Sequence, residues 1–369
     1  MNRNILLLSL VSFLNDLSSE VISAALPLFI LQLGGGGYTA GFIGGLRELV
    51  ASLLKLPAGY LSDRVGLKKP FVVAGYAVSA FFKLLIGVSK TPFHLVVFSS
   101  LERLGKGIRT APRDAIISLS AGKSGESFGL HRAFDTAGAL AGSLLALFLV
   151  KAFSVRETVI AGALISLFAL VPLLLVKEPE VKERVKRGSI RLEAGFKRLT
   201  VAAFFFSLSS VTYLFFLMWI KEKTGSESLT ILLYALYNLF YTLFSFPAGK
   251  LADRVGKAKV LVAGYLLFSF FSAGFLLSTS VFWFGFLFSI YGISSAITDG
   301  VQRAFVSDLT GEKVKGTAFG VFHAVSGVGA LISNLVGGFL WNENPYYLFL
   351  FSAVLSVISA VVVFFVDRR

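Results

Sequence analysis

The sequence predicts an all-α membrane protein with 12 transmembrane helices in two six-helix bundles. Three observations support this prediction. The 369-residue chain is 55% hydrophobic and only 15% charged, long apolar segments recur along its whole length, and one charged turn occurs twice. A soluble domain of this length carries more charge on its surface. Each apolar segment of about 20 residues is long enough to cross the roughly 30 Å hydrocarbon core of a bilayer.

The order of the elements follows from where the apolar segments are interrupted. The glycines at 34–37 and the prolines Pro92, Pro179 and Pro345 mark turns between helices. The predicted helices are 4–32, 38–62, 70–89, 93–117, 126–150, 156–176, 198–220, 228–251, 259–279, 282–307, 316–340 and 345–366. The longest and most basic connection is a linker at 177–197, which divides the chain into an N-terminal domain, 1–176, and a C-terminal domain, 198–369.

The net charge of +14 is explained by membrane topology. Lysine and arginine gather in alternate loops, and such loops remain on the cytoplasmic side of a membrane. We therefore expect a multi-pass protein of the plasma membrane, with both termini and the linker in the cytoplasm. Anionic lipid head groups then account for the excess positive charge, without a nucleic-acid partner. The chain has no Cys, which excludes disulfides and thiolate metal sites.

The duplicated turn spans residues 57–69 and 247–259, where nine of thirteen positions are identical at an offset of 190. An Ala-Gly-Tyr triplet follows both copies, at 74–76 and 263–265. Since the offset is about half the chain length, we infer that one membrane bundle was duplicated. The identical residues include Gly59, Asp63, Arg64 and Gly66 in the first copy, and Gly249, Asp253, Arg254 and Gly256 in the second.

This turn resembles the motif Gly-x-Leu-x-Asp-Arg-x-Gly-x-Lys between the second and third helices of the major facilitator superfamily. Gly59, Leu61, Asp63, Arg64, Gly66 and Lys69 fit it. The resemblance implies two bundles around a central cavity that work by alternating access. It also implies that the turn belongs to a cytoplasmic gating network, to which we assign Gly59, Asp63, Arg64, Gly66, Arg113, Asp114, Asp135, Gly249, Asp253, Arg254 and Gly256.

Two further motifs are similar to those of proton-coupled and antiporting members. Arg103-Leu-Gly-Lys106-Gly107 is similar to Arg-x-x-Gln-Gly, with Lys where Gln is usual. In the fifth helix, Gly129, Gly138 and Gly142 keep the antiporter spacing, although Ser143 replaces the usual Pro and Ala146 replaces the last Gly. The alternative for these glycines is close helix packing alone.

Ionisable residues inside the first bundle are costly to insert and are treated as candidates for function. Asp16 and Glu20 share one face of the first helix, and Glu48 lies near the middle of the second. We expect these three to carry protons, since burial disfavours the charged form of a carboxylate. The neighbouring polar groups are expected to line the substrate cavity: Asn15, Arg47, Glu102, Arg103 and Lys106. The alternative is that these charges only pair with one another and hold the helices together.

The second bundle is expected to contribute an aromatic wall. Tyr234, Tyr237, Asn238 and Tyr241 fall on one helical face, and Asp299 adds a carboxylate from another helix. Tyrosine faces can stack on a flat or amphipathic ligand while their hydroxyls form hydrogen bonds. The alternative for each tyrosine is packing within the bundle together with a place in the aromatic belt at the membrane interface.

The prediction that follows is a secondary transporter, most simply a proton antiporter that exports a small amphipathic or charged organic compound. Symport of an organic anion held by Arg47, Arg103 or Lys106, and flipping of a lipid or lysolipid, are the alternatives. An enzyme is not expected, because the sequence has neither a zinc-binding His-Glu-x-x-His nor a Gly-x-Ser-x-Gly pattern. We expect a monomer that uses the proton gradient, with no cofactor and no metal.

Overall fold

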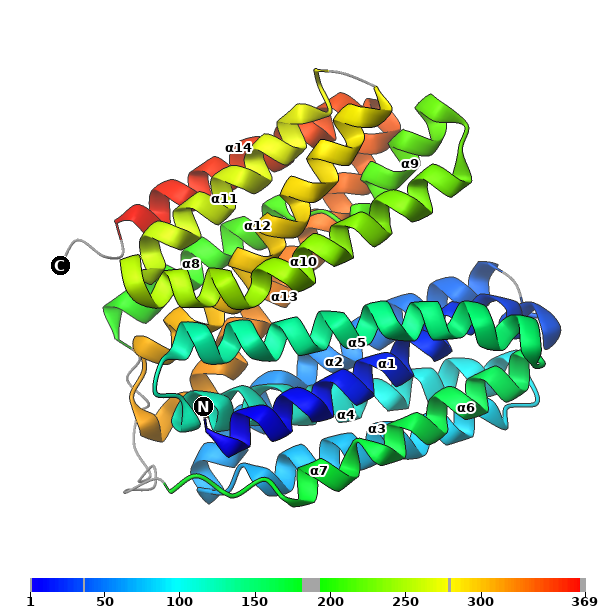
Figure 1. The fold of residues 1–369 in the computed structure, drawn as a ribbon, viewed down its shortest axis with the longest axis horizontal. Helices are drawn as coiled ribbons and strands as arrows, with labels where there is room; N and C mark the ends of the chain where they lie inside the picture. The colour runs from blue at the N-terminus through cyan, green and yellow to red at the C-terminus, as the bar shows by residue number, and fades with distance from the viewer. Residues whose placement is uncertain (1, 36, 181–192, 278–279, 366–369) are drawn as a thin grey trace. The chain divides into compact units, whose positions relative to one another are not determined.

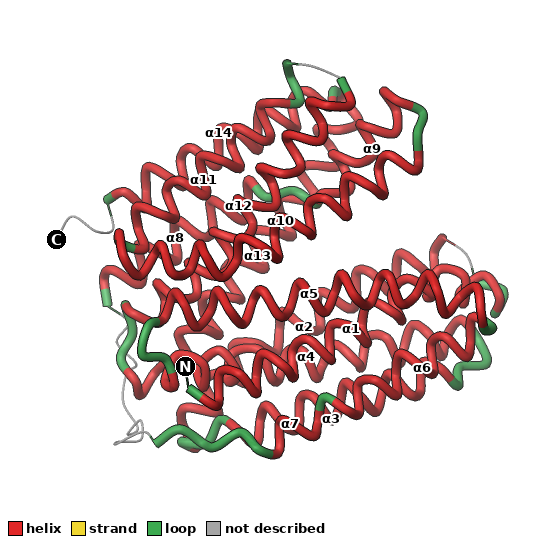
Figure 2. The backbone as a smooth tube through the Cα atoms, viewed as in Figure 1, coloured by secondary structure: helices red, strands yellow, loops and turns green. Residues whose placement is uncertain are grey.

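The computed structural model describes residues 2–35, 37–180, 193–277 and 280–365, and every long element within them is an α-helix (Figure 2). The helices are α1 Arg3–Gln32, α2 Gly37–Val65, α3 Lys69–Gly87, α4 Pro92–Ser120, α5 Ser124–Ala152, α6 Val155–Phe168, α7 Leu170–Leu174, α8 Ala194–Ser209, α9 Tyr213–Thr224, α10 Glu227–Val255, α11 Lys257–Gly274, α12 Val281–Asp308, α13 Lys315–Glu343 and α14 Pro345–Phe364, with a short 3-10 turn, η1 Glu312–Val314, before α13. Most of the linker, 181–192, lies outside the described residues.

Two predicted helices are each interrupted. The segment predicted at 156–176 is α6 followed by α7, and that predicted at 198–220 is α8 followed by α9. Counting each pair as one helical segment, the described helices form 12 segments in the predicted order. Among the described residues, nine segments are long and apolar enough to cross a membrane by length and composition alone.

Local signals explain where the helices start. Pro92 and Pro345 stand at the first positions of α4 and α14, where a missing N–H costs nothing. The side chains of Thr91 and Asn344 accept hydrogen bonds from the first turns of these helices. α6 begins with a capping box, in which Ser154 and Glu157 bond reciprocally.

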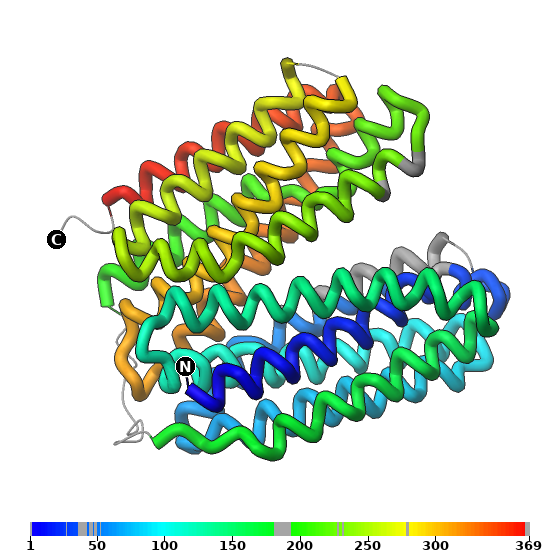
Figure 3. The backbone as a smooth tube through the Cα atoms, viewed as in Figure 1, coloured from blue at the N-terminus to red at the C-terminus, as the bar shows by residue number. Residues whose placement is uncertain are grey.

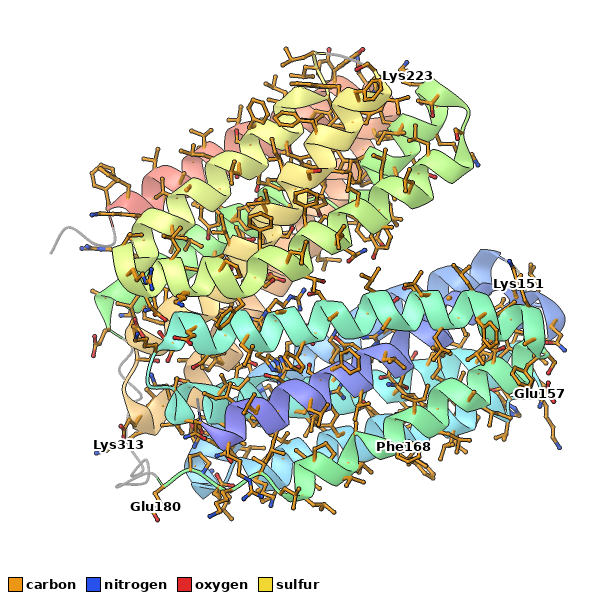
Figure 4. The ribbon with its side chains drawn as sticks, in the orientation of Figure 1. Lys151, Glu157, Phe168, Glu180, Lys223 and Lys313 are labelled. Carbon is orange, nitrogen blue, oxygen red and sulfur yellow. The ribbon has the colours of Figure 1, made fainter. Side chains whose placement is uncertain are left out.

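Large apolar side chains are exposed along the helices, as expected for surfaces that face lipid. Phe168, for example, is 65% exposed and points outward from α6 in Figure 4. Labelled charges such as Lys151, Glu157 and Lys223 lie at the ends of their helices in the same view. The protein therefore presents apolar side regions and polar ends, which is the pattern of a membrane bundle.

The helices pack into two compact units. Unit 1 contains residues 1–122, 134–190 and 311–323. Within it α4 packs on both α2 and α3, and α6 packs on α1 and α3 (Figure 1). One core cluster of this unit surrounds Phe29 and joins α1 to α6 through Val159 and Ala163. The predicted domains 1–176 and 198–369 stay a proposal about the organisation of the chain.

Unit 2 contains residues 123–133, 191–310 and 324–369. Here α12 packs on α10 and α11, while α14 packs on α8 and α11. In the coloured trace of Figure 3, α11 and α14 run side by side within this unit. α5 and α13 contribute to both units: α5 starts in unit 2 and continues in unit 1, and α13 starts in unit 1 and continues in unit 2.

Candidate functional site

The first copy of the duplicated turn places Asp63 at the start of α13. Its carboxylate accepts hydrogen bonds from the backbone N–H groups of Gly316 (3.1 Å) and Thr317 (2.6 Å) and from the Thr317 hydroxyl (2.8 Å). The Lys68 ammonium lies 3.3 Å from the same carboxylate, and both side chains are almost fully buried. Asp63 therefore neutralises the N-terminal N–H groups of a helix and a buried cation at once.

The second copy repeats this geometry in unit 2. Asp253 accepts hydrogen bonds from the backbone N–H groups of Gly125 (2.9 Å) and Glu126 (2.7 Å) at the start of α5. Lys257 pairs with Asp253 at 2.9 Å and also with Asp308 at 2.6 Å. In both copies, therefore, the duplicated Asp caps the N-terminus of a helix from the other half of the sequence.

Glycines of the turn serve two purposes. Gly66 and Gly256 adopt φ values of 74° and 101°, in the left-handed region that favours glycine. A Cβ on Gly59 would collide with the Gly316 carbonyl, and one on Gly249 would collide with the Gly125 carbonyl. The arginines of the turn, Arg64 and Arg254, are exposed.

A second charged group forms further along α4. Arg113 contacts the neighbouring carboxylate of Asp114 at 3.0 Å, and Nε2 of His323 on α13 lies 2.8 Å from the same carboxylate. Both acids predicted for the gating network on α2 and α4, Asp63 and Asp114, therefore bind the first part of α13. His323 was not among the predicted residues.

Polar groups of α1 and α5 meet inside unit 1. The Ser12 hydroxyl donates to Asp135 at 2.5 Å, and the carboxyls of Asp135 and Asp16 are within hydrogen-bonding reach of each other. The Asn15 amide donates to Asp16 at 3.0 Å. Asp135, which we assigned to the gating network, is thus placed beside a predicted proton carrier.

The cations of the first bundle converge on Glu102, which is 3% exposed. Arg47 of α2 lies 3.7 Å from this carboxylate and Arg103 lies 3.2 Å from it. Three cations also attract the Glu20 carboxylate electrostatically: Arg103, Lys106 and Arg47. The side chain of Glu48 lies outside the described residues.

Two charged residues that sequence reasoning missed are prominent in unit 1. Lys83 of α3 is 2% exposed and binds oxygen atoms of α1. Glu178, after α7, accepts hydrogen bonds from the backbone N–H groups of Lys68 (2.8 Å) and Lys69 (2.7 Å) and so caps α3. A lone Lys in an apolar helix and an acid in a linker give no sequence signal of their distant partners.

The three glycines of α5 allow close packing on different neighbours. A Cβ on Gly129 would meet the Ser245 carbonyl of α10. Cβ atoms on Gly138 and Gly142 would collide with the carbonyls of Phe13 and Leu17 on α1. The second and third glycines therefore bring α5 against the stretch of α1 that carries Asp16.

In unit 2 the predicted aromatic face joins rings from three helices. Tyr213 of α9 stacks on Tyr234 at 4.7 Å, Tyr234 stacks on Tyr237 at 5.9 Å, and Tyr237 stacks on Tyr291 of α12 at 4.4 Å. We call these four residues the tyrosine stack. The Asn238 amide donates to the Tyr234 carbonyl at 3.0 Å, which is a hydrogen bond within α10 itself.

Tyr241 connects the aromatic face to an ion pair. Arg132 of α5 lies 2.7 Å from the Asp299 carboxylate and donates to the Tyr241 hydroxyl at 2.5 Å. The Tyr241 hydroxyl also bonds to Asp299. The Asp299 side chain is 45% exposed, which leaves one side of this group open.

The interruption between α8 and α9 adds a polar feature near the tyrosine stack. The Thr212 backbone N–H donates to the side-chain oxygen of Asn334 on α13 at 3.0 Å. Non-helical backbone at membrane depth is tolerated where protein or water satisfies it. Tyr213, the first residue of α9, is also the end of the tyrosine stack.

Comparison with known proteins agrees with this arrangement. The profile of the Major Facilitator Superfamily matches residues 8–220 and 199–369. An uncharacterized MFS-type transporter of Methanocaldococcus jannaschii is 42% identical, over 99% of this chain and 95% of its own length. The multidrug resistance protein MdtH of Proteus mirabilis is 26% identical, over 87% of this chain and 84% of its own length.

The fold is likewise matched by solved structures. The human organic anion transporter MFSD10 superposes with a TM-score of 0.82 at 14% sequence identity, covering 98% of this chain and 99% of that one. These matches confirm the predicted family and the predicted 12-helix fold. Among the described residues, no three His, Asp or Glu side chains are grouped so as to hold a metal ion.

Proposed function

Because the chain belongs to the major facilitator superfamily, we propose that it exports a small amphipathic or charged organic compound in exchange for protons. The family makes it a membrane transporter and not an enzyme. Direction, coupling ion and substrate class are our proposal. The similarity to proteins named for multidrug resistance supports export.

The observation that carries proton coupling is the contact between Asp16 and Asp135. Two carboxyls in direct contact oppose each other's ionisation, so the pair is suited to hold one shared proton. Ser12 and Asn15 donate to the two members and fix their positions. The glycines Gly138 and Gly142 set the spacing of the helices that carry them.

Coupling requires that the proton changes the affinity for the substrate. Loss of the shared proton adds a negative charge beside the cations Lys106 and Arg109, which both act on Asp16. A substrate in the proposed cavity would then meet a different net charge on the wall of unit 1. Within unit 2, the tyrosine stack and the open side of Asp299 are a separate proposed surface for an aromatic or charged compound.

The structure favours neither alternative. Arg47 and Arg103 share the single carboxylate of Glu102, which offsets part of the positive charge that an organic anion would use. The tyrosine stack would suit an amphipathic compound as well as a lipid, so it does not favour flipping over export. Both alternatives can be decided in the assay that tests the main proposal.

The test uses the full chain in proteoliposomes that enclose a pH-sensitive dye and have an acidic lumen. Addition of ethidium, an amphipathic aromatic cation, is expected to make the lumen more alkaline as protons leave in exchange for the probe. Asp16→Asn should lose this exchange. Glu157→Gln, at the exposed start of α6, should keep it.

Probe movement that ignores the gradient in both the wild type and Asp16→Asn would refute the proposal. Entry of protons together with benzoate, an organic anion, would indicate symport. Gradient-independent movement of a fluorescent lysolipid between leaflets would indicate flipping.

A further inference from the structure

Lys83 lies inside unit 1 with its ammonium surrounded by oxygen atoms of α1. It belongs to α3 and is 2% exposed. Its Nζ lies 3.2 Å from the Asn15 carbonyl, 3.2 Å from the Asn15 side-chain oxygen, 3.1 Å from the Ser18 hydroxyl and 2.9 Å from the Ser19 hydroxyl. All four oxygens come from little more than one turn of the helix.

This arrangement is a complete binding site for an ammonium group. An ammonium has three N–H donors and no acceptor, and the site offers it neutral oxygen acceptors only. A buried cation is costly unless such groups replace its water shell. The side chain of Lys83 thus reaches across from α3 to fill a site built by α1.

Asn15 links this site to the carboxyl pair of the proposed function. Its amide oxygen accepts from Lys83, whereas its amide nitrogen donates to Asp16 at 3.0 Å. An Asn amide can be turned by 180° at little cost unless its partners select one orientation. A cation on the oxygen side directs the nitrogen toward Asp16, because an amide nitrogen cannot accept from an ammonium.

We propose that residues 15–19 of α1 form an ammonium-binding site which Lys83 occupies as a tethered ligand, and that the bound ammonium orients the Asn15 amide toward Asp16. Lys83 is then a positioning residue for proton coupling. This second part rests on the proposed function, whereas the first part stands without it.

Other charges around Lys83 bear on any pH dependence. The charged groups that interact electrostatically with the Lys83 ammonium are Asp16 and Glu20 of α1 and Glu102, Arg103 and Arg109 of α4. α6 also packs on α3 and carries Arg156 and Glu157 in its first turn. The four hydrogen bonds of Lys83 described above all go to neutral oxygens of one helical turn.

The binding site is tested by chemical rescue of the purified full-length protein in nanodiscs. Lys83→Ala opens the site, so its melting temperature should fall and should recover as methylammonium chloride is added. Tetramethylammonium chloride at the same concentration should give no recovery, because that cation has no N–H donor. Lys83→Met fills the space with an apolar chain and should respond to neither salt.

Two results overturn the ammonium site. One is equal recovery of Lys83→Ala with both salts, which would indicate a general salt effect. The other is no recovery with methylammonium while Lys83→Ala remains folded. If Lys83→Ala does not fold, Ser19→Ala decides, because loss of the oxygen nearest to the ammonium must lower the melting temperature more than Ser143→Ala, whose hydroxyl bonds only within α5.

The positioning role is tested by the pH profile of ethidium exchange. Loss of the ammonium removes a cation near Asp16, so Lys83→Met should move the pH midpoint of exchange upward by about one unit. An unchanged midpoint in Lys83→Met would refute the positioning role. Absence of exchange in the wild type would instead refute the proposed function, and the rescue experiment would still decide the binding site.

Discussion

Unit 1 and unit 2 share the capped turn but differ in what they bury. Unit 1 buries ionisable groups: Glu102 lies between two arginines, and Lys83 of α3 binds oxygen atoms of α1. Unit 2 buries rings: Tyr291 lies 4.4 Å from both Tyr237 and Phe271. Directional, charged contacts fail when one partner is lost, whereas ring packing depends mainly on shape. We therefore expect single polar substitutions to damage unit 1 far more than unit 2.

The largest difference is expected between Glu102→Gln and Asp299→Asn. Glu102→Gln removes the buried anion that two partly buried arginines share and should lower the free energy of unfolding by about 3 kcal/mol. Asp299 is half-exposed, so Asp299→Asn should cost about 1 kcal/mol or less. Unfolding in mixed micelles, followed by Trp fluorescence, measures both. Equal losses would show that the two interiors do not differ in this way.

The two copies of the turn provide the next comparison. Asp63→Asn leaves Lys68 buried without a counter-ion and weakens the cap of α13. It should lower the free energy of unfolding by about 2–3 kcal/mol. Asp253→Asn should cost about 1 kcal/mol, because Lys257 keeps its contact with Asp308. The same unfolding measurement applies. A larger loss for Asp253→Asn would mean that the second turn bears more of the stability.

A smaller effect is expected at Glu178. Glu178→Gln keeps one carbonyl oxygen for the N–H groups that start α3 but removes the charge that favours a helix N-terminus. The expected loss is about 1 kcal/mol. Glu180→Gln is the matched control, since Glu180 is an exposed acid two residues away. A loss as large for Glu180→Gln would mean that general charge, not the cap, is responsible.

The smallest effect is expected for Tyr291→Phe. The ring and its stacking remain, so the free energy of unfolding should change by less than about 1 kcal/mol. Tyr241→Phe should be more damaging, because that hydroxyl bonds to Arg132 and Asp299. Thermal unfolding of both variants tests this order. The reverse order would show that the hydroxyl of Tyr291 contributes more to stability than that of Tyr241.

Sequence reasoning succeeded where the signal is local or repeated. Apolar length located the crossings, and proline marked the starts of α4 and α14. The duplication pointed to Asp63 and Asp253, although their helix partners lie more than 120 residues away.

Features that depend on a distant partner could not be predicted. The break after Ser209 has no proline or glycine, and it is satisfied by Asn334 from another helix. In the sequence Lys83 is a single charge in an apolar helix, and its partners on α1 can be identified only from the structure. Hydrogen bonds between distant residues therefore mark the limit of single-sequence reasoning here.

The reciprocal capping of α5 and α13 makes the two halves of the sequence depend on each other. Asp63 in the first half caps a helix of the second half, and Asp253 in the second half caps a helix of the first. Neither half of the sequence therefore contains both members of a capped turn, and each half needs the other to complete its own helix start.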